Sequence, residues 1–166
     1  MLGLTRRALL SAGALGAASA GVGTWSLMPG QPAYGMVVLT QSECATVTAI
    51  GQLFFPGVRL PSITEAELVV RVDRIVAEVL MPIQAGGFRY VLRALQWGTL
   101  AARGRRFTDL STDTQREVLE TWAEPEVVPR RVAGESLKAV LGMAYFGAPV
   151  VQQAIGWRTG CSGVRS

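Results

Sequence analysis

Apolar residues recur at three- and four-residue spacing from about residue 42 to about residue 155, and this helical periodicity restricts the chain's possible folds more than any other feature. No run of strict alternation, which a half-buried strand would show, interrupts the pattern. Pro56, Pro82, Gly104 and Pro125 divide it into segments, because proline cannot donate to the helical ladder and glycine favours helix ends. We therefore expect an all-α, bundle-like domain of about five to six helices, preceded by an N-terminal signal helix.

The expected helices begin and end at these breaks. Thr64 with Glu67, and Thr112 with Gln115, have the spacing of capping boxes, so one helix is expected to start at Thr64 and another at Ser111 or Thr112. The third helix follows the break at Pro82 and reaches about residue 102. The other expected helices span about residues 42–55, 64–81, 111–124, 127–146 and 149–155.

Each expected helix has an apolar side that should face the core. Asp73 is expected on the solvated side of the second helix, as an i,i+3 or i,i+4 partner of neighbouring arginines. The residues expected to point inward from the second, third and fifth helices are Leu68, Val72, Ile75, Val76, Val79 and Leu80, then Val91, Leu92, Leu95 and Leu100, then Leu137, Val140, Leu141, Ala144 and Tyr145.

The N-terminal segment resembles a bacterial twin-arginine export signal. Arg6 and Arg7 follow a threonine and precede Leu9 and Leu10, and the uncharged, Ala/Gly-rich run of residues 8–23 comes next. That run is short and weakly apolar, whereas a permanent span needs about 20 strongly apolar residues. We expect residues 1–35 to be signal and linker and residues 36–166 to be the helical domain, exported in the folded state to the periplasm or the outer face of the cytoplasmic membrane.

Two positions fit the small-residue rule for removal of the signal. One follows Ala18-Ser19-Ala20, and the other lies near Ala33. The alternatives are an uncleaved leader that anchors the protein to the membrane and a disordered N-terminal arm. A membrane-tethered structural or binding protein therefore remains a second interpretation of the chain.

The charge balance argues against a nucleic-acid partner. The chain has 16 Lys and Arg residues against 12 Asp and Glu residues. The first 20 residues contain two arginines and no acid, which leaves 14 basic against 12 acidic residues in the rest. The remaining charges of both signs are interleaved, and no basic stripe with aromatic residues stands out.

The sequence offers little catalytic chemistry. It contains no histidine, the commonest general base and a common zinc ligand. Glu65 and Glu67 fit a helix cap, and Asp109 fits a turn before a cap, so no paired-carboxylate site emerges. No phosphate-binding loop is present. We predict no catalytic, cofactor-binding or metal-ligating residue, which makes a self-sufficient exported enzyme the weaker interpretation.

The chain contains two cysteines, Cys44 and Cys161, outside any metal-binding or redox spacing. In an exported protein they can form one disulfide. Because Cys44 falls within an expected helix, a buried free thiol is the alternative.

Aromatic and arginine side chains offer a candidate partner surface. Helical spacing places several aromatic residues in the core, but a domain of this size does not bury them all. Surfaces that combine aromatic residues with arginine are enriched at protein interfaces. The candidate contacts are Arg105, Arg106, Phe107, Tyr145 and Trp157.

A series of short motifs resembles one known family. In order, these are Leu39-Thr40, Phe54-Phe55-Pro56, Val72-Asp73, the run of residues 104–111, the run of residues 119–122, the run of residues 144–149, and Ile155-Gly156-Trp157. Over most of residues 39–157 this order is similar to the gluconate 2-dehydrogenase subunit 3 family, whose members typically carry a twin-arginine signal. The loop of residues 57–63 is shorter and less acidic than the family pattern.

The resemblance implies a non-catalytic accessory subunit without a cofactor of its own. Its partner would be the large subunit of a FAD-dependent dehydrogenase of the glucose-methanol-choline type, which oxidises an alcohol or a sugar. In some such complexes a cytochrome c subunit receives the electrons. The large subunit often lacks a signal, so the small subunit would stabilise it and escort it through the twin-arginine translocase.

Overall fold

The structure is a computed structural model, and it describes residues 30–55, 63–122 and 128–157. The export-signal residues Arg6, Arg7, Leu9 and Leu10 lie outside these residues, as does Cys161. The fold described below is that of the unit that begins at Gln31.

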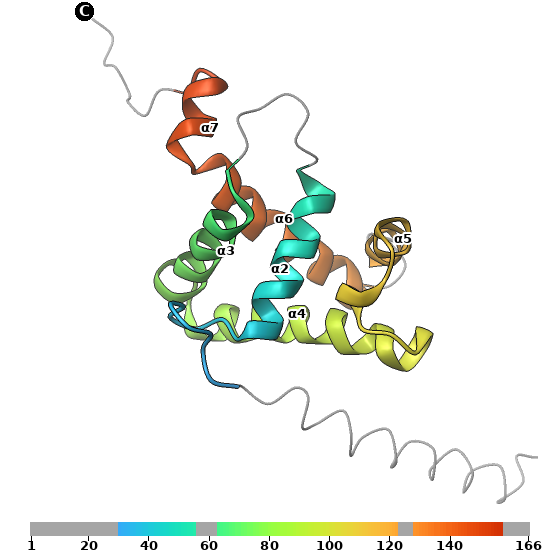
Figure 1. The fold of residues 1–166 in the computed structure, drawn as a ribbon. Coiled ribbons are helices and arrows are strands. Elements are labelled where there is room, and N and C mark those ends of the chain that lie inside the picture. Colours follow the sequence, from blue (N-terminus) through green and yellow to red (C-terminus); the bar gives the residue numbers. More distant parts are fainter. Residues whose placement is uncertain (1–29, 56–62, 123–127, 158–166) are drawn as a thin grey trace, which may run out of the picture. The chain divides into compact units, whose positions relative to one another are not determined.

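Every regular element in the described ranges is helical, which confirms the predicted all-α fold (Figure 1). A π-helical turn, η1 (Ile75–Val79), follows the second helix, and a 3-10 turn, η2 (Phe107–Asp109), precedes the fourth. The described residues form the six α-helices α2 (Gln41–Phe54), α3 (Glu65–Arg74), α4 (Pro82–Arg103), α5 (Thr112–Trp122), α6 (Val128–Phe146) and α7 (Pro149–Ala154).

The helix ends follow from local chemistry. Thr40 and Glu43 form a capping box at the start of α2, which the sequence interpretation had not identified. Thr64 accepts a hydrogen bond from the backbone of Glu67 at the predicted start of α3. Proline occupies the first turn of α4 and α7, where its missing N–H costs little. Gly104 ends α4 in the left-handed conformation, with φ of 68°.

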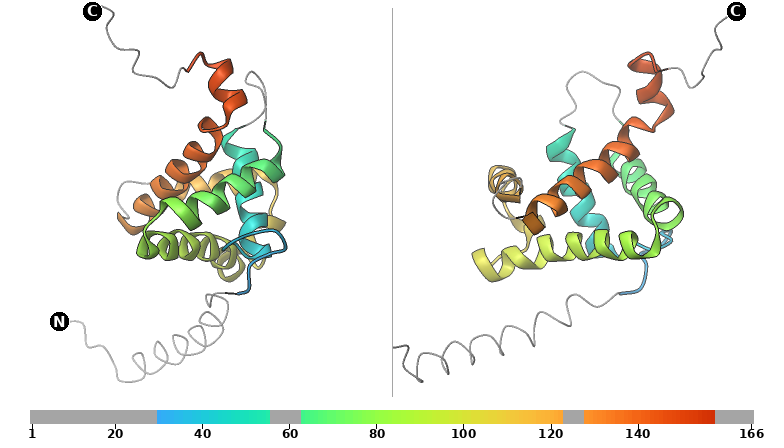
Figure 2. Two further views of the ribbon diagram at one scale, coloured as in Figure 1. Left: turned by 90° about the vertical axis from the view of Figure 1, so that its left-hand side faces the viewer. Right: turned by 180° about the vertical axis from the view of Figure 1, so that it is seen from behind.

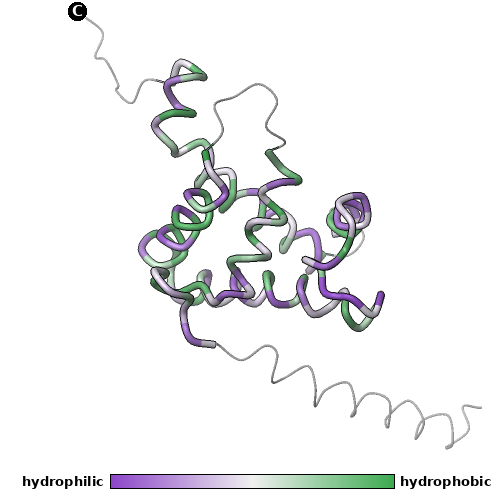
Figure 3. The backbone as a smooth tube through the Cα atoms, viewed as in Figure 1, coloured by the Kyte–Doolittle hydropathy of each residue, from purple (hydrophilic) through white to green (hydrophobic). Residues whose placement is uncertain are grey.

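Four of the helices surround the core. In Figure 1, α2 crosses α4 on the near side, α3 lies beside α2, and α6 runs behind. Figure 2 shows the reverse side, where α6 crosses in front and α2 lies behind it. Figure 3 shows apolar and polar stretches mixed along each helix, as expected for helices that pack on one side. As a result, α4 has α2 on one side and α6 on the other.

The core draws on every helix and on both short turns. The predicted inward residues of α6 are all buried, which confirms the interpretation for this helix. The largest fully buried apolar side chains of the core are Leu39, Val47, Ile50, Val72, Val76, Leu92, Leu95, Phe107, Leu137, Leu141 and Val151.

The prediction for the end of the second helix was wrong. The helix does not continue to residue 81 in α form, because the backbone widens into the π turn η1. This turn shifts the helical register, so Val76 is buried whereas Val79 is 65% exposed. Asp73, predicted on the solvated side, is also buried.

The predicted inward side of α4 was partly wrong. Leu92 and Leu95 are buried, but Leu100 is exposed and Val91 is only half-buried. The buried side runs instead through Phe88, Gln96 and Thr99. The two polar residues of this side form hydrogen bonds within the protein. The Gln96 amide donates to the Thr108 hydroxyl at 2.9 Å, and the Thr99 hydroxyl donates to a backbone carbonyl of the same helix.

Candidate subunit interface

A large apolar groove lies between α4 and α6. Its volume is about 650 Å³, within the range of binding pockets in proteins. We call it the α4–α6 groove. Its larger apolar and aromatic lining side chains are Leu80, Phe88, Tyr90, Val91, Trp122, Val132, Val140 and Met143.

The rim of the α4–α6 groove exposes apolar side chains to solvent. Tyr90 is 54% exposed, Val132 61% and Met143 45%. Ile83 lies one turn before Gly87, which lines the groove, and is largely exposed as well. Isolated apolar residues on a surface need no explanation, but a contiguous set around a hollow is typical of an interaction site.

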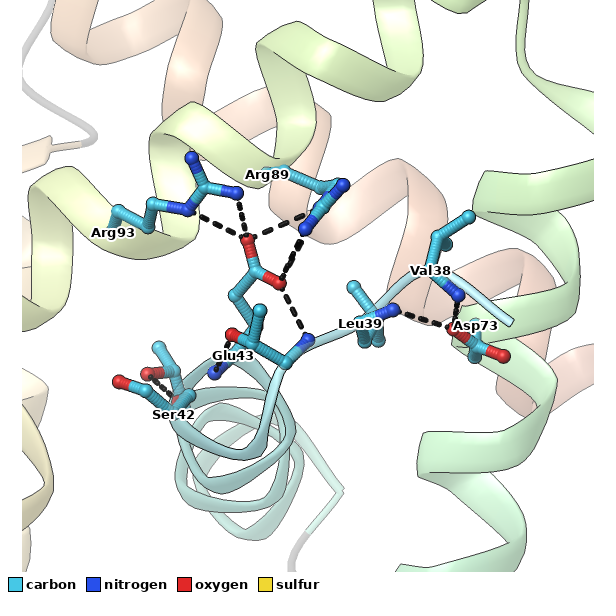
Figure 4. A network of polar contacts seen from close by, with 9 residues as sticks. Val38, Leu39, Ser42, Glu43, Asp73, Arg89 and Arg93 are labelled. Atoms are coloured by element: carbon cyan, nitrogen blue, oxygen red, sulfur yellow. Dashed lines mark hydrogen bonds and ion pairs between the residues drawn. The ribbon is translucent and has the colours of Figure 1, made fainter. Parts of the chain in front are cut away.

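The opposite side of α4 is fixed by a buried charge network (Figure 4). Glu43 of α2 is 1% exposed, and its carboxylate accepts hydrogen bonds from Arg89 and Arg93 of α4. The Arg93 guanidinium lies 2.8 Å from the Glu43 Oε1 atom, and the Arg89 Nε atom lies 3.2 Å from it. The Glu43 Oε2 atom also accepts from the Thr40 amide at 2.7 Å. This network holds α4 against the start of α2.

A second buried carboxylate fixes the segment that leads into α2. Asp73 of α3 accepts hydrogen bonds from the backbone amides of Val37, Val38 and Leu39, at 2.6, 3.0 and 2.8 Å. Figure 4 shows Asp73 facing this segment. Because backbone amides outside a helix or sheet need other partners as the chain enters the core, the carboxylate replaces the bonds that a helix would have supplied. Asp73 is thereby assigned a structural role.

Two of the five predicted partner contacts are buried. Phe107 has no exposed surface, because η2 turns it into the core. Tyr145 is 7% exposed and stacks on Phe55, with ring centroids 4.1 Å apart. Neither side chain is available on the predicted surface, which corrects that expectation for both.

The other three predicted contacts are exposed but do not lie together. Arg105 and Arg106 follow the end of α4, and the Arg106 guanidinium lies 4.7 Å from the centre of the Trp97 ring. Trp157, 63% exposed, follows α7, which lies at the other end of the domain (Figure 1). They form no single surface, and none of them lines the α4–α6 groove.

The described residues include no group of three or more potential metal ligands of the His, Cys, Asp and Glu types. Cys44 is half-buried beside the two buried carboxylates. Burial first, and then the negative charges of Asp73 and Glu43, raise the pKa of its thiol to about 11. A thiol with this pKa is a poor nucleophile near neutral pH. The pairing of Cys44 with Cys161 stays a prediction, because Cys161 is outside the described part of the chain.

None of the helices within the described ranges has both the length and the apolar character needed to span a membrane.

Sequence reasoning missed the α4–α6 groove because it assigned one apolar side to each helix. On α4, Gly87, Tyr90 and Ala94 add a second apolar side next to the buried one. On α6, Val132 and Met143 do the same. A helix with apolar residues around more than one side, in a domain too small to surround it, was the signal that could have revealed the groove.

Comparison with known proteins gives one match. The family model described as gluconate 2-dehydrogenase subunit 3 matches residues 41–163. No curated protein and no solved structure matches the chain.

Proposed function

The chain belongs to the gluconate 2-dehydrogenase subunit 3 family, and from this premise we propose that it is a non-catalytic small subunit that binds, stabilises and escorts a dehydrogenase large subunit. The proposed partner is a FAD-dependent alcohol or sugar dehydrogenase of the glucose-methanol-choline type. The observation that carries the proposal is the family match, which covers residues 41–163 and so takes in every α-helix of the described part of the chain. A subunit of a dehydrogenase complex must have a surface for its partner.

The surface chemistry supports binding rather than catalysis. The α4–α6 groove is lined mostly by carbon, and none of its lining residues is an Asp, Glu, His, Cys or Lys that could act as a general base. The buried acids are engaged in fixing α2 and α4. FAD and the chemistry of oxidation are accordingly proposed to belong to the partner.

The proposed stabilisation of the partner works by mass action. A subunit that binds the folded dehydrogenase and not the unfolded one shifts the folding equilibrium toward the folded state. An interface that survives transport would bury about 1,600 Å² or more in total, the size of a standard stable interface. The twin-arginine route carries folded cargo, so a complex formed in the cytoplasm would cross the membrane as a unit and act in the periplasm or on the outer face of the cytoplasmic membrane.

The escort function is tested by replacing Arg6 and Arg7 with lysine in the native host. This change keeps the charge but removes the two arginines of the signal. We therefore expect the small subunit and the flavoprotein both to remain in the cytoplasm while still purifying as a complex. The measurement is dehydrogenase activity in periplasmic and cytoplasmic fractions. A flavoprotein that still reaches the periplasm in this variant would refute the escort. Replacing Arg105 and Arg106 with lysine is the matched control and should leave export unchanged.

A further inference from the structure

The strongest unassigned feature is the α4–α6 groove. We propose that this groove is the docking site for the dehydrogenase subunit, and that it receives an amphipathic helix of that subunit carrying acidic residues near its ends. The inference rests on the proposed function, since it identifies where and by what chemistry the partner binds.

The dimensions of the α4–α6 groove suit a helix. Its α4 wall runs from Gln84 to Ala94, which is about 15 Å at the helical rise, or about three turns. Docking an apolar helical face into such a groove uses anchors at i, i+3 or i+4, and i+7. The incoming helix would then lie between Tyr90 on α4 and Val132 and Met143 on α6, and would cover these exposed rim residues.

Gly87 lets a partner come close to the backbone of α4. A Cβ atom built on Gly87 meets nothing within 4 Å, so the chain's own packing does not require glycine there. Glycine within a helix is less stable than alanine, so the position is unfavourable for the isolated subunit. A partner that packs directly on the α4 backbone benefits from the missing side chain. Ala94 on α4 and Ala133 on α6 are small in the same way.

The charges around the groove identify the sign of the partner. Arg130 lines the groove, and Arg74 lines an adjoining hollow that shares Met143 with it. Neither arginine forms an ion pair with an acid in the described part of the chain. Acidic residues on the incoming helix would complement both positions.

Two other occupants fit the groove less well. A pocket for a small ligand encloses most of that ligand, whereas this groove has the exposed side chains Tyr90, Val132 and Met143 along its rim. A second copy of the chain would bring the same face against itself, so arginines would meet arginines across a two-fold interface.

The decisive variant is Gly87→Trp, with Gly86→Trp as its control. The groove has room for the indole, and both glycines have open space around the Cβ position, so both variants should fold with unchanged or higher thermal stability. Only Gly87 lines the groove. We expect Gly87→Trp to reduce the flavoprotein recovered with the tagged subunit by at least tenfold, and Gly86→Trp to recover as much as the wild type.

The charge element is tested with the Arg74→Glu/Arg130→Glu double variant. We expect it to weaken recovery of the flavoprotein and to reverse the salt dependence of the complex, because each introduced glutamate repels the acidic residues of the partner and added salt screens this repulsion. Arg131→Glu, on the same helix but outside the groove lining, is the control and should bind normally. If the double variant binds as the wild type does, with the same salt dependence, the proposed acidic residues on the incoming helix would be refuted.

The outcomes separate this inference from the proposed function. If the wild-type chain recovers no flavoprotein, the proposed function fails. If the wild type and Gly87→Trp recover it equally, only the groove assignment fails. A wild-type dimer that Gly87→Trp converts to monomer, or a small molecule released from the wild type alone on denaturation, would also overturn the assignment, because another occupant would then fill the groove.

Discussion

The side of α4 that faces α2 is charged and closed, whereas the side that faces α6 and solvent is apolar and open. On the closed side, Arg89 and Arg93 bind Glu43, and none of the buried side-chain polar atoms in the described ranges lacks a partner. On the open side, Gly87, Tyr90 and Ala94 line a groove that the chain leaves unfilled. The two sides belong to the same helix, so one side positions the other.

The difference separates fixing a helix from binding a partner. Buried ion pairs pay a desolvation cost that offsets much of their attraction, but their directional bonds favour one arrangement of the helices. Apolar surface has no such directionality, and its burial is favourable against any complementary shape. The closed side therefore sets the position of α4, and the open side supplies binding energy once a partner covers it.

Breaking the closed side at Glu43 should have the largest effect on stability. Glu43→Gln keeps the volume but leaves two mostly buried guanidinium groups without their carboxylate. We expect a loss of about 3 kcal/mol in the free energy of unfolding, at the lower end for a broken buried pair because both arginines retain some contact with water. Urea denaturation of the purified subunit measures the change.

The control for Glu43 is an exposed ion pair elsewhere in the domain. Glu117 pairs with Arg103 at 3.5 Å, and both side chains are largely exposed. Glu117→Gln should therefore cost less than about 1 kcal/mol. Equal losses in the two variants would contradict the view that the Glu43 network sets the position of α4.

Loss of the Asp73 carboxylate should have the next largest effect. Asp73→Asn replaces one acceptor oxygen with an amide NH2 group, which donates and cannot accept from the backbone amides of residues 37–39. Hydrogen bonds to a charged group contribute about 1.5–3 kcal/mol each, and part of this returns through water, so we expect a loss of about 2 kcal/mol. Hydrogen exchange should accelerate at these amides more than in α6. Asp113→Asn, at an exposed pair with Arg116, should change neither measurement.

The sequence predicts the helices better than the polar contacts between them. Breaks at Pro56, Pro82 and Gly104 gave most helix bounds to within a residue or two, because proline and glycine act locally. The contacts of Asp73 with the segment before α2, and of Glu43 with α4, were missed since these partners lie 34 to 50 residues away along the chain. Local spacing shows that arginines lie near Asp73 in the sequence. It cannot show that the carboxylate binds the backbone amide of Leu39 instead.

The candidate interface was predicted less well than the fold. Phe107 and Tyr145 were proposed as partner contacts, although Tyr145 was also expected to point inward, because composition alone cannot distinguish an interface aromatic from a core one. The groove needs two helices side by side, and no property of α4 or α6 taken singly encodes that juxtaposition. The export signal remains a prediction, since Arg6 and Arg7 lie beyond the described residues.

The reactivity of cysteine thiols compares the two sides of α4 directly. The variants that this comparison needs have the smallest expected effect on stability. In a Cys161→Ser background, Cys44 reports on the closed side, and a Cys44→Ser/Tyr90→Cys variant reports on the open side. Burial and neighbouring carboxylates raise the pKa of Cys44 to about 11, so about 0.1% of it is thiolate at pH 8. An exposed thiol of ordinary pKa, about 8.5, is about one quarter thiolate at the same pH.

The open-side thiol should therefore react with iodoacetamide about two orders of magnitude faster than Cys44 at pH 8, as followed by mass spectrometry. The rate at Cys44 should rise about tenfold per pH unit up to about pH 11, whereas the open-side rate should level off above about pH 9. The raised pKa of Cys44 also affects stability. Between the ordinary thiol pKa and about 11, the folded state keeps a proton that the unfolded state releases, so the stability that the protonated thiol contributes is lost as the pH rises through about 11.

Similar rates at pH 8 would mean that the closed side opens to solvent as readily as the groove, and the contrast between the two sides of α4 would then fail. Protection of the open-side thiol when the flavoprotein is added, with Cys44 unchanged, would place the partner on the open side alone.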